Sequence, residues 1–358
     1  MSAAPGRPQA SSHRSAQHEG SPVTGTATTD ALEVRDFTQG GAHTAAPVTT
    51  VPRYYGETLL SLARERPEIV CLTADLSGST ETDLFRDTFP ERFVMPGIAE
   101  ANMVGLAGGL ARSGMQAWLH TFCVFATRRP YDQIAMQVAY PKLDVKIVGF
   151  LPGLATILGV SHQAIDDVAL MRALPNMTVI EPSGPAQVPA AVRAAAAHKG
   201  PVYLRMTRAA VALPEGTVMQ PLEIGRIQPL LEGRDALVLA SGLAVEQATR
   251  AVQSLRAEGL DIALANVHTI KPFDEAFVRE AAARHKLIVT VENHSFIGGL
   301  GSAVAEVLAE AGGGARLVRV GVRDTFAQGA STAFLFERHG LSASGIAATL
   351  RAELKARA

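Results

Sequence analysis

The residues from Pro96 to Phe125, PGIAEANMVGLAGGLARSGMQAWLHTFCVF, place one carboxylate, Glu100, in an apolar, glycine-rich segment that ends with two phenylalanines. At helical spacing, Glu100 shares a face with Met103 and Val104. Burying an ionised carboxylate without a partner costs several kcal/mol, so a buried Glu100 must be protonated or hydrogen-bonded to a polar group in a pocket. Such a carboxyl group can share a proton with a ligand. The alternative is a Glu in the first turn of a helix, favoured by the helix dipole and open to water.

The elements that must position Glu100 follow from the apolar periodicity of the chain. From Arg53 onward, short apolar runs with strand character alternate with helical segments, which predicts parallel α/β sheets. Predicted strands lie at Ile69–Ala74, Ala117–Phe122, Val145–Phe150, Met177–Glu181 and Val202–Met206, and then at Ala236–Ala240, Asp261–Asn266 and Leu287–Glu292. Predicted helices lie near 54–66, after Ala99, after Pro185, and at Ala244–Glu258 and Asp274–Arg284.

The same alternation of strands and helices predicts two α/β domains, each a mainly parallel sheet flanked by helices. Residues 1–46 are rich in Ser, Thr, Gly, Pro and Ala with few bulky apolar side chains, so we expect a disordered tail. The first domain is predicted at 47–213. Pro214, Gly216 and Pro221 mark a linker at 214–230, and the second, smaller domain covers 231–358.

Composition excludes several classes of function. The chain has 358 residues, of which 47% are hydrophobic and 19% charged, which describes a soluble globular protein. A net charge of -1 without basic runs argues against nucleic acid as a partner. No segment has the roughly 18 apolar residues that a membrane span needs, and the N-terminus lacks the apolar core of a secretory signal. Cys71 and Cys123 lie in apolar runs, which indicates reduced structural thiols and a cytoplasmic location.

Six segments, in this order, resemble the C-terminal portion of transketolase over about residues 50 to 350. They are TADLSGST at 73–80, GIAEANMVGLAGGLA at 97–111, TFCVFATRRPYDQI at 121–134, SHQAIDDVALMRALPNMTVIEPS at 161–183, YLRMTR at 203–208 and ENHSFIGGLGSAV at 292–304. The resemblance implies a thiamine diphosphate pyrimidine-binding domain followed by a transketolase C-terminal domain.

The resemblance implies a cofactor role for three side chains. Glu100 matches the glutamate that hydrogen-bonds N1′ of the aminopyrimidine ring of thiamine diphosphate, and thereby helps to remove the proton from C2 of the thiazolium ring. Phe122 and Phe125 match aromatics that pack on the aminopyrimidine ring, although two Phe residues after a strand could equally fill ordinary core. Where the family often has a further aromatic, this chain has Arg128.

The resemblance also implies a substrate site. Arg53, Ser79 and Arg208 match positions that hold the phosphate of sugar phosphates, for which guanidinium forks are well suited. The alternatives are surface charges for the arginines and a helix cap for Ser79. His162 matches a histidine at the reacting oxygens of the sugar, where an imidazole can transfer protons near neutral pH; otherwise it is a loop histidine bonded to local backbone.

The loop before His162 departs from the family pattern. Members often carry an acidic G-E-D-G or G-K-D-G segment, whereas this chain has ATILGVSHQ. Leu158 stands about where the family has an aspartate that recognises a donor hydroxyl. A site that lacks this partner discriminates less, so we expect an altered donor preference and a specialised biosynthetic pathway.

The chain also lacks part of the family's cofactor site. It has no G-D-G motif followed by Asn, the elements that tie the two phosphates of thiamine diphosphate to a divalent metal. We therefore expect a split transketolase: an N-terminal subunit provides the diphosphate and Mg²⁺ ligands, this chain provides none, and two heterodimers assemble into a heterotetramer. The predicted reaction moves a two-carbon ketol unit from a ketose phosphate to an aldose acceptor.

Two other interpretations remain open. The β subunit of a 2-oxoacid dehydrogenase E1 component has the same domain order, and a degenerate subunit could serve only as a scaffold. Within ENHSFIGGLGSAV, the glycine cluster could suggest phosphate binding, but a turn and a tight helix start are the simpler explanation.

Overall fold

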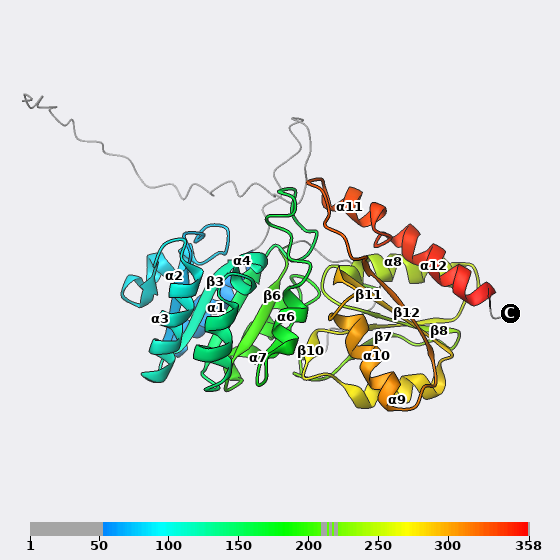
Figure 1. Ribbon diagram of the computed structural model, residues 1–358, viewed down its shortest axis with the longest axis horizontal. Helices are drawn as coiled ribbons and strands as arrows, with labels where there is room; N and C mark the ends of the chain where they lie inside the picture. Colours follow the sequence, from blue (N-terminus) through cyan, green and yellow to red (C-terminus); the bar gives the residue numbers. More distant parts are fainter. Residues whose placement is uncertain (1–52, 209–212, 215–216, 218–220, 357–358) are drawn as a thin grey trace, which may run out of the picture. The chain divides into compact units, whose positions relative to one another are not determined.

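The computed structural model describes residues 53–356 apart from 209–212, 215–216 and 218–220. The tail predicted at 1–46 and part of the predicted linker lie outside the described residues. The described part contains a seven-stranded and a five-stranded sheet, both mainly parallel and both flanked by helices (Figure 1). The predicted α/β fold class is thereby confirmed.

The first sheet has the strand order β10-β5-β6-β4-β3-β1-β2, and only β10 runs antiparallel to its neighbour. Its strands are β1 (Ile69–Thr73), β2 (Phe93–Val94), β3 (Gln116–Phe122), β4 (Val145–Phe150), β5 (Thr178–Ile180), β6 (Val202–Met206) and β10 (Thr269–Lys271). Five of them, β1, β3, β4, β5 and β6, are almost wholly buried, as expected for parallel strands covered on both faces.

Helices cover the two faces of this sheet. Those of the first half are α1 (Tyr54–Glu65), α2 (Asp83–Thr88), α3 (Glu100–Arg112), α4 (Cys123–Thr127), α5 (Tyr131–Gln133), α6 (Asp167–Ala173) and α7 (Val188–Ala197), with a π-helix η2 (Ile134–Ala139) and a 3-10 turn η1 (Pro90–Arg92). One core cluster joins α1 and α7 to the sheet, and a second joins α3, α4 and η2 to its other face. Glycine makes the contact between α3 and η2 close: a Cβ on Gly108 would lie 3.0 Å from the carbonyl oxygen of Gln137.

The second sheet has the order β12-β11-β8-β9-β7. Its strands are β7 (Gln228–Leu231), β8 (Ala236–Ala240), β9 (Ile262–Asn266), β11 (Leu287–Ser295) and β12 (Arg316–Val322), and its helices are α8 (Ala244–Ala257), α9 (Glu275–Arg284), α10 (Leu300–Glu310), α11 (Thr332–Arg338) and α12 (Ala343–Lys355). A third core cluster packs α8, α11 and α12 on one face, while α9 and α10 share the cluster that also contains α3.

Four strands lie where the sequence prediction has none, namely β2, β7, β10 and β12. β7 begins at Gln228, inside the range predicted as linker, and pairs antiparallel with β9. β10 belongs to the later half of the chain but pairs with β5 of the first sheet. The two halves are also joined by Arg205, whose guanidinium donates to the carbonyl oxygen of Asn293 at 3.0 Å.

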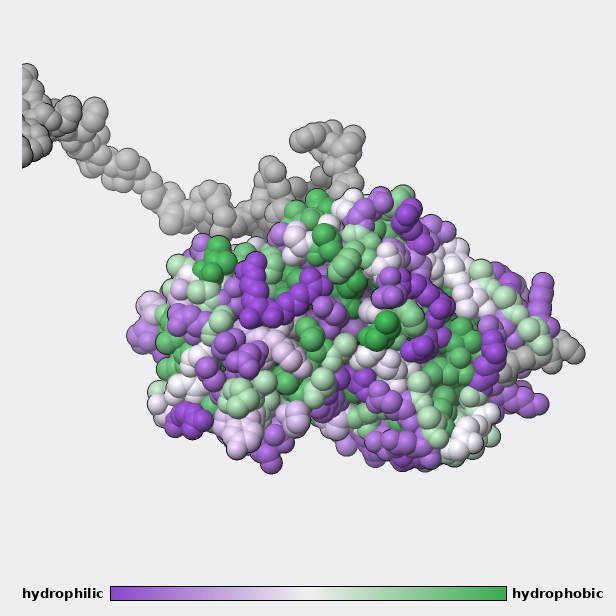
Figure 2. Space-filling model, viewed as in Figure 1, coloured by the Kyte–Doolittle hydropathy of each residue, from purple (hydrophilic) through white to green (hydrophobic). Residues whose placement is uncertain are grey.

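Most large apolar side chains are in these clusters, but some remain exposed. On the face drawn in Figure 2, hydrophobic residues surface in several patches separated by hydrophilic ones. Exposed large side chains include Ile98, Leu106, Met136 and Tyr140, which lie before, on or just after α3 and η2. Within the described residues, none of the helices combines the length and apolar character that crossing a bilayer would require.

Candidate functional site

Most of the residues singled out from the sequence lie near the carboxyl ends of parallel strands in the first sheet. Ser79 follows β1, Phe122 ends β3, His162 lies in the loop after β4, and Arg208 follows β6. Arg53 directly precedes α1. Open α/β sheets bind ligands at this edge, because the loops that leave neighbouring parallel strands converge there.

Glu100 is the first residue of α3 and is only 4% exposed. It therefore occupies a first-turn position, as the simpler interpretation proposed, but it is not open to water. Its Oε1 accepts a hydrogen bond of 2.7 Å from Nη1 of Arg129, and this ion pair compensates the buried charge. The structure thus supports a buried carboxylate with a partner.

Arg129 links several of the predicted site residues, although sequence reasoning missed it. Besides binding Glu100, its guanidinium carbon lies 4.1 Å from the centre of the Phe125 ring, which is a cation–π distance. Its neighbour Arg128 points to different partners, the carboxylate of Asp166 and the carbonyl oxygen of Gln163. The only signal in the sequence was the charged pair within TRRP, which does not show which arginine faces Glu100.

Phe122, Phe125 and His162 form an aromatic group beside this ion pair. The ring centres of Phe122 and Phe125 are 6.1 Å apart, and His162 lies 6.2 Å and 5.2 Å from them, edge-on to Phe125. Both Phe side chains are half-buried and also pack against the core, so the core interpretation holds in part. Burial, and then the charge of Arg129, lowers the pKa of His162, so its imidazole is biased towards the neutral form.

The immediate contacts of His162 are local. Its Nδ1 lies 3.0 Å from the hydroxyl of Ser161, and its backbone N–H donates to the carbonyl oxygen of Gly159. Leu158, at the start of this turn, is 45% exposed. The loop is held by the second half of the chain, because the side chain of Asn293 accepts from the backbone N–H of Leu154 at 2.9 Å.

The chemistry of these groups suits a heteroaromatic ring. A buried carboxyl group can bind a ring nitrogen, half-buried Phe rings offer a stacking surface, and a neutral imidazole can transfer protons nearby. No cluster of three or more His, Cys, Asp and Glu side chains suited to a metal ion occurs among the described residues. The arrangement can therefore hold the ring of a cofactor at Glu100.

The predicted phosphate-binding residues also come together, but with carboxylates between them. Nε of Arg208 lies 3.2 Å from Oε1 of Glu81, and its Nη1 donates to the carbonyl oxygen of Ser79 at 3.4 Å. Arg53 forms an ion pair with Asp83. Thr82, rather than Ser79, precedes the first residue of α2, so Ser79 is not the cap of that helix.

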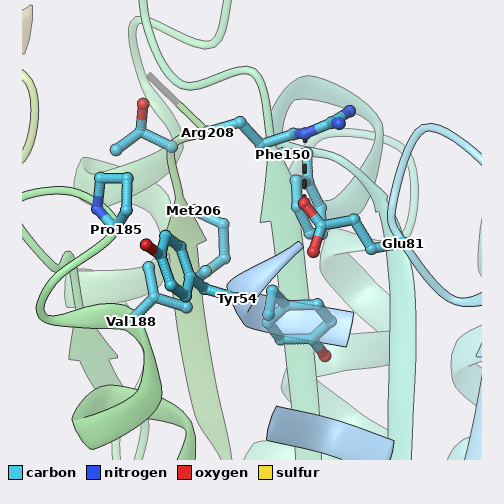
Figure 3. Close-up of a pocket in the computed structure, with 9 residues that line it drawn as sticks. Tyr54, Glu81, Phe150, Pro185, Val188, Met206 and Arg208 are labelled. Carbon is cyan, nitrogen blue, oxygen red and sulfur yellow. Dashed lines mark ion pairs between the residues drawn. The ribbon is translucent and has the colours of Figure 1, made fainter. Parts of the chain in front are cut away.

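Glu81 is the central residue of this second group. It is 2% exposed, has a φ of 60°, and its Oε2 accepts a 2.9 Å hydrogen bond from the backbone N–H of Gly56 in the first turn of α1. Burial raises the pKa of Glu81, while the Gly56 N–H and the charges of Arg208 and Arg53 act in the opposite direction. Figure 3 shows its carboxylate turned towards Arg208 in a small pocket.

The glycine-rich segment after β11 has a structural explanation. Glu292 on β11 accepts hydrogen bonds from the backbone N–H groups of Leu300 and Gly301, at 2.7 Å and 2.9 Å. The chain's own carboxylate therefore occupies the N-terminus of α10, the end of a helix at which anions generally bind. This geometry supports the turn and helix start over a phosphate site.

Comparisons with known proteins show which proteins this chain resembles. The chain matches the family described as "Transketolase, pyrimidine binding domain" over residues 49–214 and "Transketolase, C-terminal domain" over 225–346. A Methanocaldococcus jannaschii protein named as a transketolase C-terminal section is 41% identical over 303 residues, which are 84% of this chain and 95% of that protein. A Clostridium protein named 6-deoxy-6-sulfo-D-fructose transketolase subunit is 42% identical, over 82% of this chain and 90% of its own length.

A solved structure also resembles this chain over most of its length. The structure described as "Split gene transketolase, inactive beta4 tetramer" has 43% sequence identity to this chain and a TM-score of 0.77. The match covers 85% of this chain and 97% of that one. Both halves of the chain are therefore covered by one related polypeptide of similar extent.

Proposed function

This chain belongs to the transketolase family, and we propose that it is the C-terminal subunit of a split transketolase that transfers a two-carbon ketol unit from a ketose to an aldose acceptor. The observation that carries the proposal is Glu100, a buried carboxylate at the carboxyl edge of a pyrimidine-binding domain, beside two Phe rings. A pyrimidine-binding domain of this family implies thiamine diphosphate as the cofactor.

Thiamine diphosphate, when bound, supplies the carbon nucleophile that carries the two-carbon unit. Glu100 holds a proton at the ring nitrogen of the aminopyrimidine, and Phe122 and Phe125 hold the plane of the ring. Arg129 keeps Glu100 oriented through their 2.7 Å ion pair, and so acts as a positioning residue. His162, biased towards its neutral form, accepts a proton from a hydroxyl of the substrate.

A partner subunit completes the site in this proposal. The relative named as a C-terminal section and the solved split-gene transketolase both match this chain over most of their own lengths. Ile98, Leu106, Met136 and Tyr140 are between 41% and 77% exposed around the helix that begins with Glu100, and exposed apolar side chains are typical of interfaces. We place the diphosphate and Mg²⁺ ligands on an N-terminal subunit and expect a dimer of heterodimers.

The end of the substrate furthest from the reacting carbon lies at Arg53, Ser79 and Arg208 in this proposal. The sequence predicts that the donor substrate is a ketose phosphate. The Clostridium relative is named instead for a sugar whose end group is a sulfonate, so the end group differs within the family. Arg208 and Arg53 are already paired with Glu81 and Asp83, and this pairing affects which end group the site can accept.

The test is to co-express the chain with an N-terminal transketolase subunit and to supply thiamine diphosphate, Mg²⁺, hydroxypyruvate and a panel of aldoses. We expect mass spectrometry to detect ketoses two carbons longer than the acceptor, formed by the complex but not by either subunit alone. Robust transfer by this chain alone would contradict the split-subunit proposal. Oxidative decarboxylation of a 2-oxoacid without ketol transfer would favour the dehydrogenase E1 alternative.

A further inference from the structure

We propose that Glu81 is a specificity-determining residue that occupies the anion position of the substrate site, so that the enzyme selects sugars with an uncharged end over sugar phosphates. The inference rests on the proposed function and concerns the end of the sugar furthest from the reacting carbon. It departs from the phosphate-binding role predicted from the sequence.

The position that Glu81 occupies has the features of an anion site. It lies at the N-terminus of α1, a helix of 12 residues whose first N–H groups point outward. The side chain of Arg208 flanks it at 3.2 Å, and the positive charge of Arg53 also acts on it. A helix N-terminus with two guanidiniums is an arrangement that favours a phosphate or a carboxylate.

The chain fills this position with its own carboxylate. One oxygen of Glu81 accepts from Gly56 N–H at 2.9 Å, and the other faces Arg208. The pocket around it, lined also by Tyr54, Phe150 and Met206, leaves room for about one water molecule, with about 10 Å³ open to the water's centre (Figure 3). A phosphate group that bound between Gly56 N–H and Arg208 would have to displace the carboxylate of Glu81.

The backbone keeps Glu81 in place. A Cβ on Gly56 would lie 2.5 Å from the carbonyl oxygen of Glu81 and 2.9 Å from its Cβ, so only glycine lets the loop approach α1 this closely. Glu81 itself has a left-handed φ of 60°, which a non-glycine residue adopts only where its surroundings hold it there. The side chain is thus built into the site and is not a mobile surface group.

The charges of the group then disfavour a dianion. Arg208 and Arg53 are matched by Glu81 and Asp83, so the group is balanced before any substrate arrives. A phosphate would add two negative charges next to a buried carboxylate, and would leave that carboxylate without its partner if it displaced it. A terminal hydroxyl adds no charge and can hydrogen-bond to the groups already present.

The test compares D-ribose 5-phosphate with D-ribose as acceptors for the complex, with hydroxypyruvate as the donor. The measured quantity is the ratio of kcat/KM for the phosphorylated acceptor to that for the free sugar. The variant is Glu81→Gln, which keeps the shape of the side chain and removes its charge. The matched control is Asp87→Asn on α2, an exposed acid 65% accessible at its side chain.

We expect a ratio of one or below for the wild type, an increase of at least tenfold in Glu81→Gln, and a change of less than twofold in Asp87→Asn. A wild type that prefers ribose 5-phosphate by tenfold or more would overturn the proposal, as would a Glu81→Gln ratio within threefold of the wild-type value. If Glu81→Gln does not fold, the wild-type ratio alone decides.

If the proposed function itself is wrong, the result is different: the complex transfers no two-carbon unit to either acceptor. In that case, the melting temperatures of the same complexes with ribose 5-phosphate still report on Glu81, since a bound ligand stabilises the folded state. The proposal predicts a larger increase for Glu81→Gln than for the wild type. Equal increases would contradict it.

Discussion

Glu292 offers a quantitative test of the structure, because its carboxyl group is buried at the N-terminus of α10. Burial raises the pKa of Glu292 to about 7 from an ordinary value of 4.5, although the N–H groups of Gly301 and Leu300 act in the opposite direction. The negative charge of Glu181 raises it further, and Arg205 lowers it. The folded protein therefore holds a proton that the unfolded chain has already released between these two pH values.

The sign of the effect on stability follows from proton linkage. Since the folded state binds the extra proton, the free energy of unfolding falls as pH rises from about 4.5 to about 7, and is level above that. A pKa difference of this size corresponds to about 3 kcal/mol in the free energy of unfolding. Gln cannot ionise but keeps an oxygen that can accept from an α10 N–H, so Glu292→Gln should lack this loss.

The assay is urea denaturation of the wild type and Glu292→Gln at pH 5 and pH 8, followed by circular dichroism. Between these pH values the free energy of unfolding should fall by about 2 to 3 kcal/mol more in the wild type than in the variant, because all other titrating groups are common to both proteins. Glu310→Gln, an exposed acid at the end of α10, should behave as the wild type. Identical pH dependence in the wild type and Glu292→Gln would refute the reasoning.

Three further predictions concern other parts of the structure. Arg205→Met should destabilise the protein by about 3 to 5 kcal/mol in urea denaturation, since it leaves buried carboxylates without a partner, whereas Arg316→Met, at an exposed pair, should cost about 1 kcal/mol or less. Gly299→Ala should lower the free energy of unfolding by at least about 2 kcal/mol, because its Cβ would overlap the carboxylate that caps α10. Gly109→Ala, whose added Cβ meets open space, should stabilise α3 by about 0.5 to 1 kcal/mol. Arg129→Met should lower ketol transfer by the complex and move the acidic limb of its pH–rate profile to higher pH, because it removes a charge that lowers the pKa of a neighbouring histidine.

Much of the fold could be predicted because its strands are short apolar runs between helices. The strands at Val145–Phe150, Val202–Met206 and Ala236–Ala240 have the predicted limits, and α3 begins directly after Ala99. The pairing of β10 with β5 could not be predicted. It joins segments about 90 residues apart, and three residues carry too little pattern to show which strand they will meet.

Most of the predicted site residues share one edge of one sheet because they follow parallel strands that are neighbours in that sheet. The partners of those residues were not predictable. Arg129 and Arg128 are adjacent in the sequence, yet one binds Glu100 and the other Asp166. Glu81 depends on a left-handed backbone and on the close approach of Gly56, which no local pattern reveals.

The measurement that tests the central claim most directly is ketol transfer by the reconstituted complex carrying Glu100→Gln. The variant keeps the size and a hydrogen-bonding oxygen of the side chain but cannot exchange the proton. We predict a fall in kcat of at least about 100-fold, the scale of a lost acid–base group, with assembly of the complex unchanged by gel filtration. Transfer at the wild-type rate by a correctly assembled Glu100→Gln complex would contradict the account.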